Sequence, residues 1–166
     1  YDRLINVFAE INDPEWKLYI VGGDALKLNN SEKYRQQVEA MGLQDRVILT
    51  GMQKNVDDYL NRANIFVFPS SSEGFPNVIG EAMAAGLPVV SYDCMAGPSD
   101  MVEEGKNGYL VPVFDDEAMK ARLVELMRNE PLREEMGNYA QQSIIKFDKE
   151  EICQRFYEFI TKDCQQ

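Results

Sequence analysis

The sequence predicts an α/β fold in which a parallel β-sheet carries helices on both faces. Short apolar runs alternate with longer amphipathic stretches, and this alternation is typical of βα units. Most of the apolar runs end at glycine or proline, as strands that enter loops do. The run at 65–68 is apolar at nearly every position, which a strand buried on both faces requires. Each crossover should be right-handed.

The first half of the chain contains two βα units after an opening helix. Ser31 can cap a helix that Gly42 ends. Gly22 and Gly51 close the first two apolar runs. In chain order we expect a helix over 4–11, a strand over 17–21, a helix over 31–41, a strand over 46–50 and a short helix over 56–63.

The second half repeats the pattern and then becomes helical. Pro88 is tolerable only at the start of a strand, and Pro131 suits the first turn of a helix. We expect strands over 65–68, 87–91 and 109–111, helices over 77–85 and 100–104, and then three helices over 115–129, 131–145 and 148–162. The last helix has an apolar face, which should pack on the core beside the sheet: Ile152, Phe156, Phe159 and Ile160. We expect a single domain over 1–166.

Composition excludes several classes of function. The 166 residues hold 17 basic and 28 acidic side chains, a formal charge of −11, with three cysteines and no histidine. Catalytic triads and zinc sites that use histidine are impossible within this chain. The excess of acidic over basic residues argues against nucleic-acid binding and against membrane binding through a polybasic patch. Three unclustered cysteines indicate a reducing compartment, so we expect a cytoplasmic protein.

The candidate site lies beyond the carboxyl ends of the strands, where open α/β sheets bind ligands. Loops there begin at Gly22, Gly51, Pro69 and Asp93. The loop over 69–77 combines serines, a carboxylate, a glycine and a proline. Its glycine lets backbone approach a ligand, and the helix that opens at its end presents N–H groups suited to an anion such as phosphate.

Glu73 and Glu81 are eight residues apart, so both could face one cleft. Paired carboxylates serve acid–base chemistry or the recognition of hydroxyl groups. Two negative charges would repel a phosphate, which favours hydroxyl recognition at the sugar ends of a nucleotide sugar. The alternative is that both are solvated surface acids.

Five short motifs carry a family resemblance: Phe66-Val-Phe-Pro-Ser70, Glu73-Gly-Phe-Pro-Asn77, Glu81-Ala-Met, Gly86-Leu-Pro-Val-Val90 and Asn107-Gly-Tyr-Leu-Val111. In this order they resemble the C-terminal domain of the group-1 retaining glycosyltransferases, which are two-domain enzymes of the GT-B fold. Each GT-B half is a Rossmann-like parallel sheet. The likeness extends over nearly the whole chain.

The resemblance implies a donor domain for a nucleotide-diphosphate sugar, most commonly UDP-hexose or UDP-N-acetylhexosamine. It implies that Glu81 binds the ribose hydroxyls and that Glu73 contacts the transferred sugar as the catalytic residue. It further implies that the backbone of Gly74, Phe75, Pro76 and Asn77 holds sugar or phosphate oxygens. Transfer would retain the anomeric configuration and need no metal or other cofactor.

The segment from Asp93 to Asp100 resembles a subgroup whose members build bacterial surface polysaccharides such as capsule or lipopolysaccharide. It implies that Gly97, Pro98 and Ser99 belong to the donor site, beside the glycine loops at Gly22 and Gly51. The alternative is a tight turn that only starts the next helix. Cys94 is better suited to a small buried position than to a nucleophile.

The resemblance also implies missing parts. Family members carry an arginine and a lysine on a first strand that would precede Tyr1, and an N-terminal domain that binds the acceptor. We therefore expect the first strand and that domain to be absent, the fragment to be inactive alone, and a glycan or lipid-linked acceptor to bind the missing domain. The full-length enzyme would lie at the inner face of the plasma membrane, with no direct membrane contact from this fragment.

Two other readings stay open. A GT-B phosphorylase or epimerase could use the same cleft, but a phosphorylase needs a lysine for pyridoxal phosphate, and none lies between Asn55 and Asp100. A non-catalytic Rossmann-like module could bind a nucleotide. Neither a Gly-x-Gly-x-x-Gly motif nor a Walker A loop is present, which weakens that reading.

Overall fold

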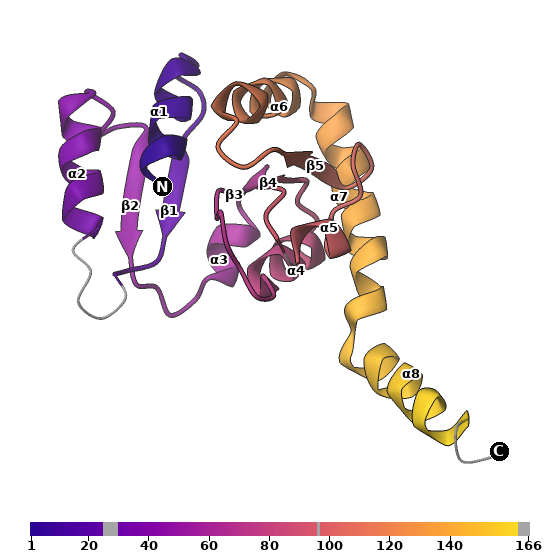
Figure 1. Cartoon of the computed structure of the whole chain (residues 1–166). Coiled ribbons are helices and arrows are strands. Elements are labelled where there is room, and N and C mark those ends of the chain that lie inside the picture. The colour runs from indigo at the N-terminus through magenta and orange to yellow at the C-terminus, as the bar shows by residue number, and fades with distance from the viewer. Residues whose placement is uncertain (25–29, 96, 163–166) are drawn as a thin grey trace.

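Two groups of parallel strands lie side by side in the computed structural model, which describes residues 1–24, 30–95 and 97–162 (Figure 1). The first sheet pairs β1 (Leu18–Val21) with β2 (Val47–Gly51). The second has the order β3 (Phe66–Phe68), β4 (Val89–Tyr92) and β5 (Gly108–Val111). Every pairing is parallel. The predicted α/β class is confirmed, with the strands divided between two sheets.

Helices connect the strands and form the C-terminal part. They are α1 (Asp2–Glu10), α2 (Asn30–Ala40), α3 (Asp57–Leu60), α4 (Asn77–Ala84), α5 (Pro98–Met101), α6 (Asp116–Arg128), α7 (Glu130–Ile144), the 3-10 turn η1 (Ile145–Phe147) and α8 (Lys149–Lys162). The carboxylate of Asp115 caps α6 by accepting from Ala118 N at 2.9 Å. Asn129 caps α7 by accepting from Leu132 N at 3.2 Å.

Helix α1 belongs to both halves of the molecule. Its residues Leu4 and Val7 pack in one buried cluster with β4, β5 and α6. Ile5 and Phe8 pack in another with β1, β2 and α2. Because the apolar residues of α1 cover two sides of the helix, it holds the two sheets against each other.

The second sheet is anchored to α7 through close contacts and a buried amide. The side chain of Asn107 is fully buried and accepts from Glu103 N at 2.7 Å. It donates to Met101 O at 3.1 Å and to Ser143 Oγ at 3.0 Å, which ties the loop after α5 to α7. A Cβ at Gly137 of α7 would overlap the carbonyl of Gly86, so only glycine permits this approach.

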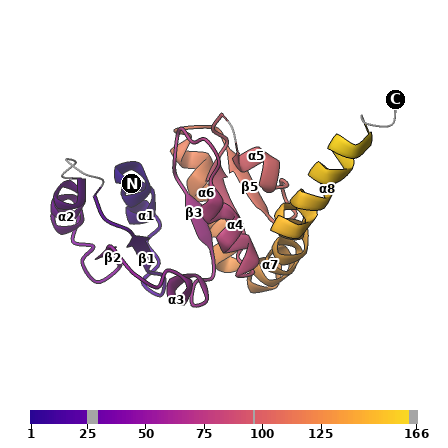
Figure 2. The same ribbon diagram turned by 90° about the horizontal axis from the view of Figure 1, so that it is seen from below.

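The last helix corrects the sequence prediction. Helix α6 packs on β4 and β5, and α7 packs on α4, but α8 contacts η1 and extends away from the body (Figures 1 and 2). The side chains predicted to pack on the core are exposed, by 45 % at Ile152, 64 % at Phe156, 67 % at Phe159 and 45 % at Ile160. Helices α4 and α7 already cover the side of the second sheet on which α8 would have to pack. The extended backbone of Asp148 then turns the chain outward.

No helix in the described part of the chain is long and apolar enough to cross a membrane.

Candidate functional site

The loop from β3 to α4 leaves the N-terminus of α4 open. Asn77 N donates to the carbonyl of Phe75 at 3.0 Å, and Ile79 N donates to that of Pro76 at 2.9 Å. No side chain caps this helix among the described residues. The positive end of the helix dipole therefore remains available to an anion that approaches the loop.

A second loop lies directly on the first. Gly97 contacts the ring of Pro76, and a Cβ at Gly97 would overlap Cδ of that proline. The backbone of Gly97 has φ 113° and ψ −58°, a conformation open to glycine. Pro98 is buried at the start of α5, and Ser99 is exposed beside it. The structure thus brings the predicted residues of the 97–99 segment against the 73–77 segment.

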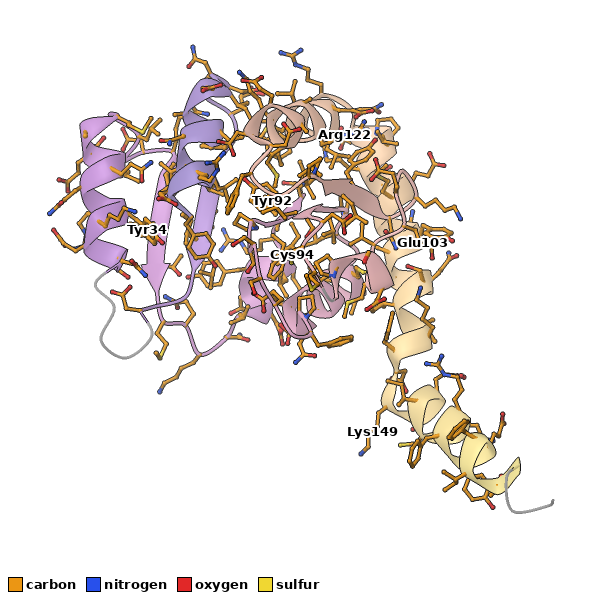
Figure 3. All side chains as sticks on the ribbon, in the orientation of Figure 1. Tyr34, Tyr92, Cys94, Glu103, Arg122 and Lys149 are labelled. Carbon is orange, nitrogen blue, oxygen red and sulfur yellow. The ribbon has the colours of Figure 1, made fainter. Side chains whose placement is uncertain are left out.

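Glu73 is exposed and lies near groups from both halves of the molecule. Burial raises the pKa of the Cys94 thiol, and the carboxylates of Glu73 and Asp93 raise it further. Burial also raises the pKa of the Tyr1 hydroxyl, and the charges of Tyr34 and Glu73 raise that pKa further. Cys94 follows β4 and is only 3 % exposed, whereas Tyr34 lies across the molecule on α2 (Figure 3). A buried thiol that holds its proton fits a packing role.

Gly22 and Gly51 meet at the end of the first sheet. Gly22 N donates to Gly51 O at 3.1 Å. Both have positive φ, 136° and 67°, which lets the two strands end in tight turns. These two glycines are neighbours at the carboxyl ends of β1 and β2.

Three of the predicted residues line two different cavities. The larger, about 980 Å³, lies between β1 and β3 and is bordered at one end by Ser70, Ser71 and Glu73. The smaller, about 450 Å³, lies between α4 and α7 and is lined by Phe75 and Asn77. The ring of Phe75 lies 6.1 Å from that of Phe147. Glu73 and Asn77 therefore open onto different cavities.

The other two predicted residues have open surroundings. A Cβ built at Gly74 would meet nothing within 4 Å, so the space above this backbone is free for a ligand. Glu81 lies one turn into α4 with an exposed side chain, and it borders neither cavity.

Sequence reasoning missed the tyrosines at this site. Tyr1 and Tyr34 form an edge-to-face pair with centroids 5.9 Å apart, and both line the larger cavity. Tyr1 immediately precedes α1 and Tyr34 lies on α2, both far from the motifs, so no local signal marks them. Within the described residues, no three His, Cys, Asp or Glu side chains are grouped so as to hold a metal ion.

Comparisons with known proteins bear on this site. The family model for glycosyl transferases group 1 matches residues 1–143. The poly(ribitol-phosphate) alpha-N-acetylglucosaminyltransferase of Staphylococcus aureus is 32 % identical over 159 residues, 93 % of this chain and 31 % of that protein. An exopolysaccharide phosphotransferase of Streptomyces coelicolor is 32 % identical over 164 residues, 97 % of this chain and 17 % of that protein.

Solved structures of glycosyltransferase relatives also match nearly the whole chain. The S. aureus protein TarM, in complex with UDP and alpha-GlcNAc-glycerol, superposes with a TM-score of 0.85 at 31 % identity over 95 % of this chain and 32 % of TarM. The Anabaena protein HepE in complex with UDP has a TM-score of 0.88 over 96 % of this chain and 44 % of HepE, at 24 % identity, and supports the fold. The chain thus spans less than half the length of each of these relatives.

Proposed function

Because the chain belongs to the group 1 glycosyl transferases, we propose that residues 1–166 form the donor-binding domain of a GT-B glycosyltransferase. The longer protein transfers a sugar from a nucleotide-diphosphate sugar to a glycan or lipid-linked acceptor. One observation supports this above the others. Gly97 and Pro76 join two loops at the carboxyl edge of the second sheet, next to the open N-terminus of α4.

In this proposal, different residues of these loops contact different parts of the donor. The N-terminus of α4 and the backbone around Gly74 face the diphosphate, whose negative charge grows as the bond to the sugar breaks. Glu73 accepts hydrogen bonds from hydroxyls of the transferred sugar. Glu81 accepts them from the ribose of the nucleotide, one helical turn away. The acids therefore contact the uncharged parts of the donor.

UDP-hexose or UDP-N-acetylhexosamine is the donor that we propose. Support comes from the UDP bound in TarM and from the S. aureus relative that is named an alpha-N-acetylglucosaminyltransferase. We propose that transfer retains the anomeric configuration and needs no metal, and that a further domain of the longer protein binds the acceptor. We propose a role in bacterial surface polysaccharides at the cytoplasmic face of the membrane; the names of the exopolysaccharide phosphotransferase and the poly(ribitol-phosphate) alpha-N-acetylglucosaminyltransferase support the polysaccharide part of this role.

Titration of UDP into the longer enzyme tests this proposal. Glu81→Ala removes a charged acceptor of two ribose hydroxyls, so the free energy of UDP binding should fall by about 1.5–3 kcal/mol, or about 10–150-fold in Kd. Glu39→Ala is the matched control, because Glu39 is an exposed acid near the C-terminal end of α2. Equal UDP affinity in the wild type and in Glu81→Ala would contradict the ribose role.

A further inference from the structure

A buried asparagine lies between β4 and the loop that carries the candidate donor residues 97–99. Asn107 opens the fifth motif of the sequence, to which the proposed function gives no role. It directly precedes β5, and its backbone carbonyl accepts from Val89 N at 3.1 Å, at the start of β4. A Cβ at the next residue, Gly108, would overlap the carbonyl of Val89. The backbone of Asn107 is therefore fixed against the amino end of β4.

The side-chain amide of Asn107 is fully buried and hydrogen-bonded at both ends. Its Oδ1 accepts from Glu103 N at 2.7 Å. Its Nδ2 donates to Met101 O at 3.1 Å and to Ser143 Oγ at 3.0 Å. A backbone carbonyl cannot donate and a backbone N–H cannot accept, so these partners require an amide in this one orientation. Neither alanine nor aspartate can replace it without leaving a buried polar group unpaired.

Helix α5 uses this amide at its C-terminal end. The helix is a single turn, Pro98–Met101, across which Val102 N donates to Pro98 O at 2.8 Å. One isolated turn is unstable, because it fixes several residues for a single hydrogen bond. Carbonyls in the last turn of a helix lack a partner within it, and Asn107 supplies one to Met101. The side chain of Met101 is also buried, in a cluster with Ile79 of α4.

The other end of α5 contacts the loop before α4. Gly97 directly precedes Pro98 and lies against the ring of Pro76, with no room for a Cβ between them. Pro76 in turn precedes the open N-terminus of α4. Any shift of α5 would therefore press Gly97 into Pro76 or separate the two loops. Asn107 at one end of α5 is thus linked to the donor loops at the other.

Helix α7 supports the same segment through two side chains. Ser143 accepts from Asn107 and donates to Ala140 O at 3.1 Å. Tyr139 donates its hydroxyl proton to the carboxylate of Glu103 at 3.1 Å. Because the Glu103 side chain is 35 % exposed, water can replace its partners. Asn107 is fully buried and water cannot reach its amide, so its bonds hold the segment more firmly.

We propose that Asn107 is a positioning residue for donor binding. It holds the C-terminal end of α5 and thereby keeps segment 97–99 against Pro76, beside the diphosphate of the donor. This inference rests on the proposed function, which places that segment at the donor. Because Asn107 is buried, it acts through α5 and touches no part of the donor. Loss of its amide should therefore weaken binding of the phosphates more than binding of the nucleoside.

Amide hydrogen exchange in the longer enzyme, measured by NMR, tests the first step. In Asn107→Ala the Val102 amide, which spans α5, should exchange at least about tenfold faster than in the wild type. The Ala85 amide is the internal control, because its bond to Glu81 O at the end of α4 has no link to Asn107. Its exchange should change by less than about twofold.

Titration of UDP and of uridine into the same enzyme tests the second step. Asn107→Ala should raise the Kd of UDP about tenfold and that of uridine less than about twofold. Leu126→Ala is the matched control, since Leu126 is fully buried on α6 in a different cluster from Met101. It should lower stability and leave both Kd values within about twofold, at a temperature where circular dichroism shows every variant folded.

A milder variant keeps the test valid if Asn107→Ala does not fold. Ser143→Ala removes one of the partners of the amide, and it should raise the Kd of UDP about threefold with that of uridine unchanged. Asn107→Asp keeps the volume but turns an oxygen toward Met101 O, so its loss of UDP affinity should at least equal that of Asn107→Ala.

Three results would overturn the inference. Unchanged exchange of the Val102 amide in Asn107→Ala would mean that Asn107 does not hold α5, whatever the donor. Equal losses for UDP and uridine, or the same loss of UDP affinity in Leu126→Ala, would assign Asn107 to general stability alone. A wild-type enzyme that does not bind UDP would contradict the proposed function, and a Val102 amide that still responds there would confine Asn107 to holding α5.

Discussion

Gly97 lies so close to Pro76 that its α-carbon has no room for a side chain. This contact joins the loop after β4 to the loop after β3, and both loops carry residues of the candidate donor site. The position of one loop is therefore set by the other, and damage to the contact should disturb stability and donor binding together.

Replacing Gly97 with alanine tests this coupling. The new Cβ would overlap Pro76 and also strain a backbone at φ 113°. We expect the free energy of unfolding to fall by about 3 kcal/mol in urea denaturation, with weaker UDP binding. Gly105→Ala is the control, since Gly105 has φ 74° but an open surrounding, and about 1 kcal/mol is expected there. Equal losses for the two variants would show that the contact with Pro76 contributes nothing.

Glu73→Gln in the longer enzyme should separate catalysis from nucleotide binding. The proposed contact is with the transferred sugar, so the rate of transfer should fall by about 10²–10³-fold. The Kd for UDP, which lacks that sugar, should change by less than about threefold. Rates from a coupled UDP-release assay, set beside calorimetry, measure both quantities. A variant with full activity would remove Glu73 from the site.

The exposed face of α8 should contribute little to the stability of this domain. Phe156 is 64 % exposed, so Phe156→Ala should change the free energy of unfolding by less than about 0.5 kcal/mol. Ile79 of α4 is fully buried, and Ile79→Ala should cost about 2–5 kcal/mol. Guanidinium denaturation of the 166-residue chain compares them. A large loss for Phe156→Ala would mean that α8 folds back onto the core in solution.

Cys94 and Cys153 should differ sharply in reactivity. Cys94 is buried and has a raised pKa, so its thiolate is scarce at neutral pH, whereas Cys153 is exposed on α8. Alkylation by iodoacetamide, followed by peptide mass spectrometry, should label Cys153 at least about tenfold faster at pH 7.5. Because the folded-state pKa of Cys94 is raised, its labelling rate should keep rising above pH 9. Fast labelling of Cys94 at neutral pH would instead indicate an activated thiol.

Local structure was predictable because its signals are local. The strand predicted over 46–50 is β2 (Val47–Gly51), and the helix predicted over 77–85 is α4 (Asn77–Ala84). Gly51 ends β2 and Asp115 caps α6, and the predicted ends at these two places agree with the structure within one or two residues. The loop that carries Glu73 was also found correctly, because serine, glycine and proline after a buried strand mark a sharp change of direction.

Features that depend on contacts between residues far apart in the sequence were not predictable. The amphipathic pattern of α8 indicates an apolar face but not what covers it. Phe75 and Asn77 line a cavity between α4 and α7, away from Glu73. The ring of Phe75 lies there because it packs near the ring of Phe147, which is seventy-two residues later in the sequence. The division of the strands between two sheets likewise reflects pairing across the chain, which no short window of sequence contains.

The two-sided packing of α1 has a consequence for unfolding. Leu4 and Ile5 are adjacent in sequence, yet they belong to different buried clusters, one under each sheet. Melting either cluster exposes one side of α1 and removes a wall from the other cluster. The two halves should therefore lose their structure in a single calorimetric transition, with one enthalpy for the whole domain.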